Sequence, residues 1–386
     1  MSLERPNAVM IAVMTATLLL AAPTSIAAQA AARDWQLPSR PSLVIGDLND
    51  TPERTFGRIA GVVRLSDGTI VAADQQALQV RFFGPDGRFI KAAGRTGGGP
   101  GEFRAMLSLH RCAGDTVVVY DPSALRLTYL GPRGDLIRTT SVQSMAEGGA
   151  PPYEVACNNS GQFLLVNRSP ARPEGIGPRR PLLRLTLAST SASASPVLID
   201  TVRATERYFD GQNDFARPLG RVMAAVVGGS RAWVSTGDAG GLRAYDLTGR
   251  SLGVVATAPG ARVRITPAVL DRFIEDELDR NATGDRAARE RLLRSLPYPA
   301  ELPVYRRLLV DAQDRLWIET YPTPGATSIR WTVLSPTGQR IGAVNVPAEF
   351  RLHDAGVDGL VGAGLSEDGV PQIWRFTLDS RRSNTR

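Results

Sequence analysis

The chain has 386 residues and a formal net charge of +7, with 38 glycines, 27 prolines and two cysteines. The basic residues are nearly all arginine, because Lys91 is the one lysine, and aromatic residues make up only 6% of the chain. Nucleic-acid binding usually combines basic residues with interleaved aromatic side chains on which bases stack. We therefore expect no nucleic-acid partner.

The first 30 residues have the pattern of a secretory signal peptide. Arg5 precedes an apolar stretch over residues 8–22, and Ala28-Gln29-Ala30 supplies the small residues of a cleavage site. No later stretch approaches the roughly 20 continuous apolar residues of a spanning helix, and no cysteine stands beside the cleavage site for lipid attachment. We expect residues 1–30 to be removed from a periplasmic or secreted protein that is neither membrane-embedded nor a lipoprotein.

Two windows of the following sequence, residues 63–94 and 110–140, share one pattern of four short apolar runs separated by turn residues. Such runs, bounded by pairs such as Asp67-Gly68, are typical of β-strands joined by hairpins. The start of the second run recurs at intervals of 47, 46, 69, 84 and 44 residues, at Ile70, Val117, Phe163, Ala232, Leu316 and Leu360.

A period near 45 residues with four strands in each unit is typical of β-propeller blades. One blade cannot bury both of its apolar faces alone, so each must pack between two neighbours. The sequence therefore predicts an all-β, six-bladed β-propeller over residues 41–380, followed by a polar tail over residues 381–386.

The sixth unit contains only three apolar runs. The isolated run over residues 41–46 has no partner near it in the sequence and would supply the missing strand. We expect this N-terminal strand to pair with the C-terminal unit and close the propeller, because closure removes an open sheet edge.

A helical insertion is predicted over residues 266–296, between blades four and five. Thr266-Pro267 is a helix-start pair, and Leu270, Phe273, Ile274 and Leu278 repeat at spacings of three and four. The insertion either packs on one face of the propeller or covers the mouth of its central channel.

The two cysteines, Cys112 and Cys157, end the first strands of consecutive units. An exported protein reaches an oxidising compartment, where the two thiols can be joined. Equivalent positions in adjacent blades can also lie farther apart than the roughly 7 Å between Cα atoms that a disulfide allows. The sequence leaves both outcomes open.

A charged residue recurs close to the start of each first strand and forms the candidate ligand site. If these side chains point into the mouth of the channel, five arginines and one glutamate would focus an anion there, although their offsets from the aligned strands differ by several residues. The candidate residues are Arg58, Arg104, Glu154, Arg221, Arg306 and Arg351.

The segment Gly97-x-Gly-Pro-Gly-Glu-Phe103 follows a unit that reads Leu65-Ser-Asp-Gly-x-Ile-Val-x-Ala-Asp74. In both motifs the chain resembles exported bacterial six-bladed β-propeller proteins related to NHL repeats, over essentially its mature length. The resemblance implies the architecture and no particular activity, since this group is largely uncharacterised.

We expect a monomeric, non-catalytic binding module whose unknown ligand is a small molecule or a protein, with an anionic ligand matching the arginines, and with no cofactor. The alternative is a lactonase similar to gluconolactonase, which would hold calcium in the channel. Glu154 is a possible channel carboxylate for that site, but the sequence nominates no metal partners for it. The two histidines, His110 and His353, are too few for a three-histidine zinc site, and no serine lies in a nucleophile-elbow motif.

Overall fold

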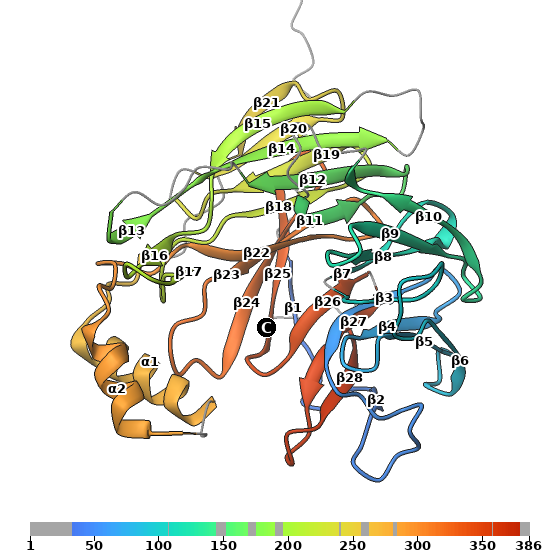
Figure 1. Cartoon of the computed structure of the whole chain (residues 1–386), viewed down its shortest axis with the longest axis horizontal. Coiled ribbons are helices and arrows are strands. Elements are labelled where there is room, and N and C mark those ends of the chain that lie inside the picture. Colours follow the sequence, from blue (N-terminus) through green and yellow to red (C-terminus); the bar gives the residue numbers. More distant parts are fainter. Residues whose placement is uncertain are drawn as a thin grey trace, which may run out of the picture. The chain divides into compact units, whose positions relative to one another are not determined.

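The computed structural model (Figure 1) describes residues 33–106, 108–143, 152–168, 175–189, 196–238, 241–255, 262–280, 284–356 and 358–378. The predicted signal peptide, residues 1–30, and the polar tail, residues 381–386, lie outside this part of the chain.

Most of the described strands belong to antiparallel sheets, which we number 1 to 6 in chain order. Sheet 1 contains β3 (Ile59–Arg64), β4 (Ile70–Asp74), β5 (Gln79–Phe83) and β6 (Phe89–Ala93). Sheet 2 contains β7 (Ser108–Arg111), β8 (Val117–Asp121), β9 (Arg126–Leu130) and β10 (Leu136–Ser141). Sheet 3 contains β11 (Pro152–Cys157), β12 (Gln162–Arg168), β14 (Leu182–Ser189) and β15 (Val197–Arg203).

The later sheets follow the same order along the chain. Sheet 4 contains β18 (Ala224–Val227), β19 (Arg231–Ser235), β20 (Leu242–Asp246) and β21 (Ser251–Val255). Sheet 5 contains β22 (Tyr305–Val310), β23 (Leu316–Thr320), β24 (Ser328–Leu334) and β25 (Arg340–Pro347), and sheet 6 contains β26 (Arg351–Ala355), β27 (Gly359–Leu365) and β28 (Pro371–Thr377). A small separate sheet joins β13 (Gly177–Arg179), β16 (Arg207–Phe209) and β17 (Asp214–Ala216).

The second strands are continuous apolar runs because both faces of each sheet are covered. Every residue of β4 and β8 is buried, as expected for a strand between two packed layers. One hydrophobic cluster joins Phe82 of sheet 1 to Phe103 and Val119 next to and within sheet 2. Each of these strands ends in a buried aspartate, and Asp121 accepts the backbone N–H of Arg104 at 2.7 Å.

The first strands of the six sheets contact one another in sequence. The contacting pairs are β3 with β7, β7 with β11, β11 with β18, β18 with β22, β22 with β26, and β26 with β3. Gly61 in β3 permits one close approach, because an added Cβ would lie 2.9 Å from Leu109 Cβ of β7. A further hydrophobic cluster joins Ile373 of sheet 6 to Ile70 of sheet 1.

The N-terminal segment is attached to two sheets. The strand expected over residues 41–46 is β2 (Leu43–Ile45), which pairs antiparallel with β28. A strand that we did not predict, β1 (Arg33–Trp35), pairs parallel with β25. Asp34 forms ion pairs with Arg330 and Arg340 at 2.9 and 2.8 Å, and Trp35 stacks on Trp317.

The helical insertion consists of α1 (Pro267–Arg280) and α2 (Arg286–Ser295). The backbone N–H of Leu270 bonds to the carbonyl of Thr266, and the Asp285 side chain accepts the N–H of Ala288 at 3.0 Å to cap α2. Ile274 and Leu278 are the buried residues of α1. The described chain is thus almost entirely β, with many small antiparallel sheets and two α-helices, which is a propeller-like architecture.

Candidate ligand-binding cavity

A cavity of about 680 Å³ lies between the first strands of all six sheets. Its volume falls in the range of small-molecule pockets, roughly 300–1,000 Å³. Each first strand contributes lining residues, among them Gly61, Ser108, Glu154, Ala225, Arg307 and His353.

Irregular pairing determines which side chains reach the cavity. In an uninterrupted strand successive side chains alternate between two faces, and one extra residue breaks this alternation. The register shifts between Pro152 and Glu154 in β11 and between Tyr305 and Arg307 in β22. As a result the adjacent residues Arg306 and Arg307 both line the cavity.

Glu154 is the carboxylate of the β11 wall. Its side chain is partly buried and borders the cavity. Within the described part of the chain it has no hydrogen bond or ion pair, and burial alone raises its pKa from 4.5 to about 7. Desolvation without a compensating partner disfavours the charged form, so this carboxylate is poised to change its charge near neutral pH.

Three arginines lie on the neighbouring walls formed by β22 and β26. Arg306, Arg307 and Arg351 all border the cavity. Arg307 is held by a hydrogen bond from Nη2 to the Leu352 carbonyl at 2.7 Å, and burial lowers its pKa to about 10, opposed by the nearby Glu319. Arg306 Nε lies 3.9 Å from Glu319 Oε2.

Glu319 is the buried counter-charge of these arginines. It lies in β23, paired directly with Arg307, and only 4% of its surface is exposed. Burial raises its pKa, and Arg307, Arg306 and Arg351 oppose this shift. One carboxylate beside three guanidinium groups leaves a net positive charge on this side of the cavity, which favours a bound anion.

Three further polar residues line the cavity, Ser108, His110 and His353. Within the described part of the chain, their Oγ and Nε2 atoms are buried and have no hydrogen bond. Burial lowers the pKa of His110 to about 4, against an opposing hydrogen bond with the Val155 backbone. Burial also holds the pKa of His353 well below its usual range, helped by Arg307 and Arg351. Both rings are therefore neutral at physiological pH.

Two aspartates, one in the turn after β22 and one near the end of β26, connect neighbouring sheets. Asp314 accepts the N–H groups of Gly229 and Ser230 at 2.7 and 3.0 Å, which joins sheet 5 to sheet 4. Asp354 accepts the N–H of Arg64 at 2.8 Å and so joins sheet 6 to sheet 1. Burial raises the pKa of Asp354 to about 6.

The structure separates the six residues that the sequence grouped into one site. Glu154, Arg306 and Arg351 line the cavity, whereas the other three do not. Arg58 and Arg104 are exposed just before β3 and β7. Arg221 pairs with Asp238 at 3.0 Å and borders a second cavity of about 190 Å³. These three precede their strands, so they do not share the position of the strand residues that face the cavity.

Sequence reasoning missed Arg307 and Ser108. Arg307 directly follows the selected Arg306, and uninterrupted alternation would place only one of the two on the cavity side. Ser108 carries no pattern in the sequence. Its position becomes visible only from the pairing, since it faces Tyr120, the residue before Asp121, as Glu154 faces Val166, the residue before Asn167.

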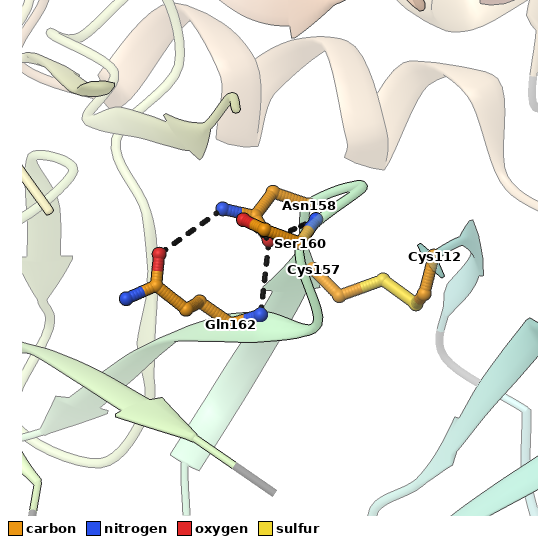
Figure 2. The surroundings of a disulfide bond; sticks show 5 residues. All are labelled: Cys112, Cys157, Asn158, Ser160 and Gln162. Atoms are coloured by element: carbon orange, nitrogen blue, oxygen red, sulfur yellow. Dashed lines mark hydrogen bonds between the residues drawn. A yellow bond between two sulfur atoms is a disulfide. The ribbon is translucent and has the colours of Figure 1, made fainter. Parts of the chain in front are cut away.

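The two cysteines are joined in the structure. Cys112 and Cys157 form a disulfide between sheets 2 and 3, with their Cα atoms 5.7 Å apart (Figure 2). The next residue, Asn158, accepts the N–H groups of Ser160 and Gln162 and donates from Nδ2 to the Gly228 carbonyl at 2.8 Å. The end of β11 is thereby tied to the sheets on both sides.

The alternative function requires a metal site. Among the described residues, no group of three or more His, Cys, Asp or Glu side chains is placed to hold a metal ion. Glu154 therefore belongs to no such group among the described residues. In the same part of the chain, no helix is both long and apolar enough to cross a membrane.

No family model matches the sequence, and no curated protein matches it. Solved structures with similar backbones include a DUF4221 family member from Bacteroides vulgatus (12% identity, 90% of this chain and 99% of that chain covered, TM-score 0.48). They also include a candidate exported protein from Bacteroides fragilis (11% identity, 90% of this chain and 99% of that chain covered, TM-score 0.47). A third is a gluconolactonase from Xanthomonas campestris (11% identity, 90% of this chain and 98% of that chain covered, TM-score 0.43). None of these likenesses assigns an activity to this chain.

Proposed function

We propose that the protein is an exported, non-catalytic binding module that takes a small ligand with an anionic group into its central cavity. In this proposal the six sheets are the blades of a six-bladed β-propeller, which β2 closes by pairing with β28. The observation that carries the proposal is the cavity itself, which has the volume of a ligand pocket and three arginines on adjacent walls.

The arginines support an anionic ligand for a physical reason. Guanidinium groups bind carboxylates and phosphates through paired hydrogen bonds, and the field of Arg306, Arg307 and Arg351 is only partly neutralised by Glu319. The calcium-dependent lactonase is the less supported alternative, because it needs several oxygen ligands around one ion.

Thermal unfolding of the mature protein with small carboxylates and phosphates tests this proposal. A ligand that binds only the folded state raises the melting temperature with its concentration. We expect saturable stabilisation by at least one class of anion, which R306A/R351A abolishes. The matched control R104A, at an exposed arginine outside the cavity, should leave it unchanged.

Two results would count against the binding module. Anions that stabilise R306A/R351A as strongly as the unchanged protein would remove the cavity from the explanation. Stabilisation by several degrees with calcium, reversed by a chelator, together with hydrolysis of a lactone would instead favour the metal-dependent enzyme.

A further inference from the structure

The polar lining of the cavity is divided between two walls. One wall consists of β7 and β11, which contact each other, and the other of β22 and β26, which also contact each other. Because the order of contacts places β3 on one side and β18 on the other between these pairs, the two polar walls lie across the cavity from each other.

The β7–β11 wall presents a carboxylate. It carries Glu154, which has no hydrogen bond or ion pair among the described residues. Ser108 and His110 also line this wall, and within the same part of the chain their buried Oγ and Nε2 atoms have no hydrogen bond. Since Nε2 of His110 has no partner, its other ring nitrogen makes the bond with the Val155 backbone, and the neutral ring leaves a lone pair on Nε2. The cation of this wall, Arg111, is already paired with Asp115 at 2.6 Å.

The β22–β26 wall presents donors. Arg306, Arg307 and Arg351 border the cavity there, and Glu319 behind them neutralises only part of their charge. The aspartates that line the cavity on this side already have partners. Asp354 accepts the Arg64 N–H, Asp311 pairs with Arg315, and Asp314 accepts the N–H groups of Gly229 and Ser230. Within the described part of the chain, no ion pair links Glu154 to any of the three arginines.

The strands between the two polar walls are apolar or small where they line the cavity. β3 contributes Ala60, Gly61 and Val63, and β18 with the residues before it contributes Met223, Ala224 and Ala225. Such walls fit a hydrocarbon body and provide no hydrogen bonds to it.

From these four walls we infer that the ligand is dipolar: a small zwitterion with a carboxylate at one end, a primary ammonium or guanidinium group at the other, and a short aliphatic body between them. The anionic group binds to Arg306, Arg307 and Arg351, and the cationic group binds to Glu154. This inference rests on the proposed function, because it names the ligand class of the same cavity. A partly buried carboxylate is costly unless a charge or donor compensates it. Glu154 has no such partner among the described residues, and the ligand cation supplies one.

Ligands that differ in only one charged group show how much the anionic end and the cationic end each contribute to binding. Isothermal titration calorimetry at pH 8 compares 4-aminobutyrate and 6-aminohexanoate with butyrate, hexanoate and hexylamine. We expect the better amino acid to bind at least about tenfold more tightly than the carboxylate of equal length, since a charge-assisted hydrogen bond is added. Hexylamine, which lacks the anionic group, should bind more weakly than the amino acid.

Two variants test which residues bind the cationic and the anionic group of the ligand. E154Q should reduce the advantage of the amino acid to less than about threefold and leave the affinity for the simple carboxylate nearly unchanged. R351A should weaken the carboxylate and the amino acid by the same factor. R88A is the control, because the Arg88 side chain is 88% exposed and pairs with Asp86 away from the cavity lining, and it should change neither affinity.

The outcomes distinguish this inference from the proposed function. Equal affinity of the unchanged protein for hexanoate and 6-aminohexanoate, and likewise for the shorter pair, would overturn the dipolar ligand and leave anion binding intact. If E154Q still binds the amino acid more tightly than the carboxylate by the full factor, the ligand cation does not bind to Glu154, and that contact is overturned. Failure of every carboxylate to bind would remove both proposals, and this comparison needs no variant to fold.

Discussion

Replacing Glu154 by glutamine should make the protein progressively more stable than the unchanged protein as the pH rises. Burial raises the pKa of Glu154 from 4.5 to about 7, so the folded state holds its proton at pH values where the unfolded chain has released it. The stabilisation from this group is fully present below pH 4.5 and is lost as the pH rises through 7.

The magnitude follows from the size of that shift. The full difference between the two pKa values corresponds to about 3 kcal/mol of unfolding free energy. Between pH 5 and pH 8 about 2.5 kcal/mol of this is lost, because a small part of the effect falls below pH 5 and the folded carboxyl is mostly ionised by pH 8. Glutamine keeps the shape of the side chain and does not titrate, so E154Q lacks this loss.

Urea denaturation followed by tryptophan fluorescence at pH 5, 6.5 and 8 measures the effect. The difference in unfolding free energy between E154Q and the unchanged protein should grow by about 2.5 kcal/mol in favour of E154Q over this range. The other buried groups, including His110 and Asp354, are common to both proteins and cancel in the comparison. E349Q, at an exposed glutamate, is the matched control.

A difference that stays constant within about 0.5 kcal/mol from pH 5 to pH 8 would refute the reasoning. It would mean that the Glu154 carboxylate is solvated or has a partner in solution. A difference that shrinks with rising pH would show that a cation stabilises the ionised carboxylate in the folded protein.

Three further predictions concern how the sheets are held together. Removing the disulfide in C112A/C157A should lower the unfolding free energy by about 4 kcal/mol, the chain-entropy value for a closed segment of this length; an unchanged denaturation midpoint, with and without reductant, would contradict it. D314A leaves the Gly229 and Ser230 N–H groups without their acceptor and should cost about 1–3 kcal/mol, measured by urea denaturation with D314N as the conservative comparison. Deleting the chain through Gly46 removes β1 and β2 and exposes the edge of β28, so calorimetry should show loss of the single cooperative transition, whereas a normal melt would argue against closure by β2.

The strands were predictable because their signal is local. β4 and β8 are continuous apolar runs between turn residues, and a strand buried on both faces requires that composition. The pairing partner of β2 was also accessible, since sheet 6 has three strands of its own and one apolar run was left over at the N-terminus. These inferences need only the count and spacing of apolar runs.

β1 and the small sheet of β13, β16 and β17 were not predicted. Each of these strands has three residues, which is too short for alternation to show. β1 is held by contacts that are distant in sequence, with Asp34 on Arg330 and Arg340. Nothing in Arg33-Asp34-Trp35 indicates those partners.

Only some of the cavity residues were predictable, because β-bulges change the side of a strand on which a side chain lies. Glu154, Arg306 and Arg351 were selected as recurring charges, and they do border the cavity. Arg307 borders it as well because of the register shift beside it. A bulge depends on how two strands pair, so one strand's sequence does not reveal it.

The pairing also shows which cavity residues the fold itself does not need. An equivalent position in the pairing is occupied by Gly61, Ser108, Glu154, Ala225 and Arg307. Each faces the next-to-last residue of its second strand, except that Glu154 faces Val166, the residue before Asn167. Glycine, serine and alanine at three of these positions show that a small residue suffices for the architecture. A carboxylate and a guanidinium at the other two carry a desolvation cost that packing does not require. Because they lie on opposite polar walls, a ligand that carries both charges compensates both costs at once, whereas a simple anion compensates only the arginine side.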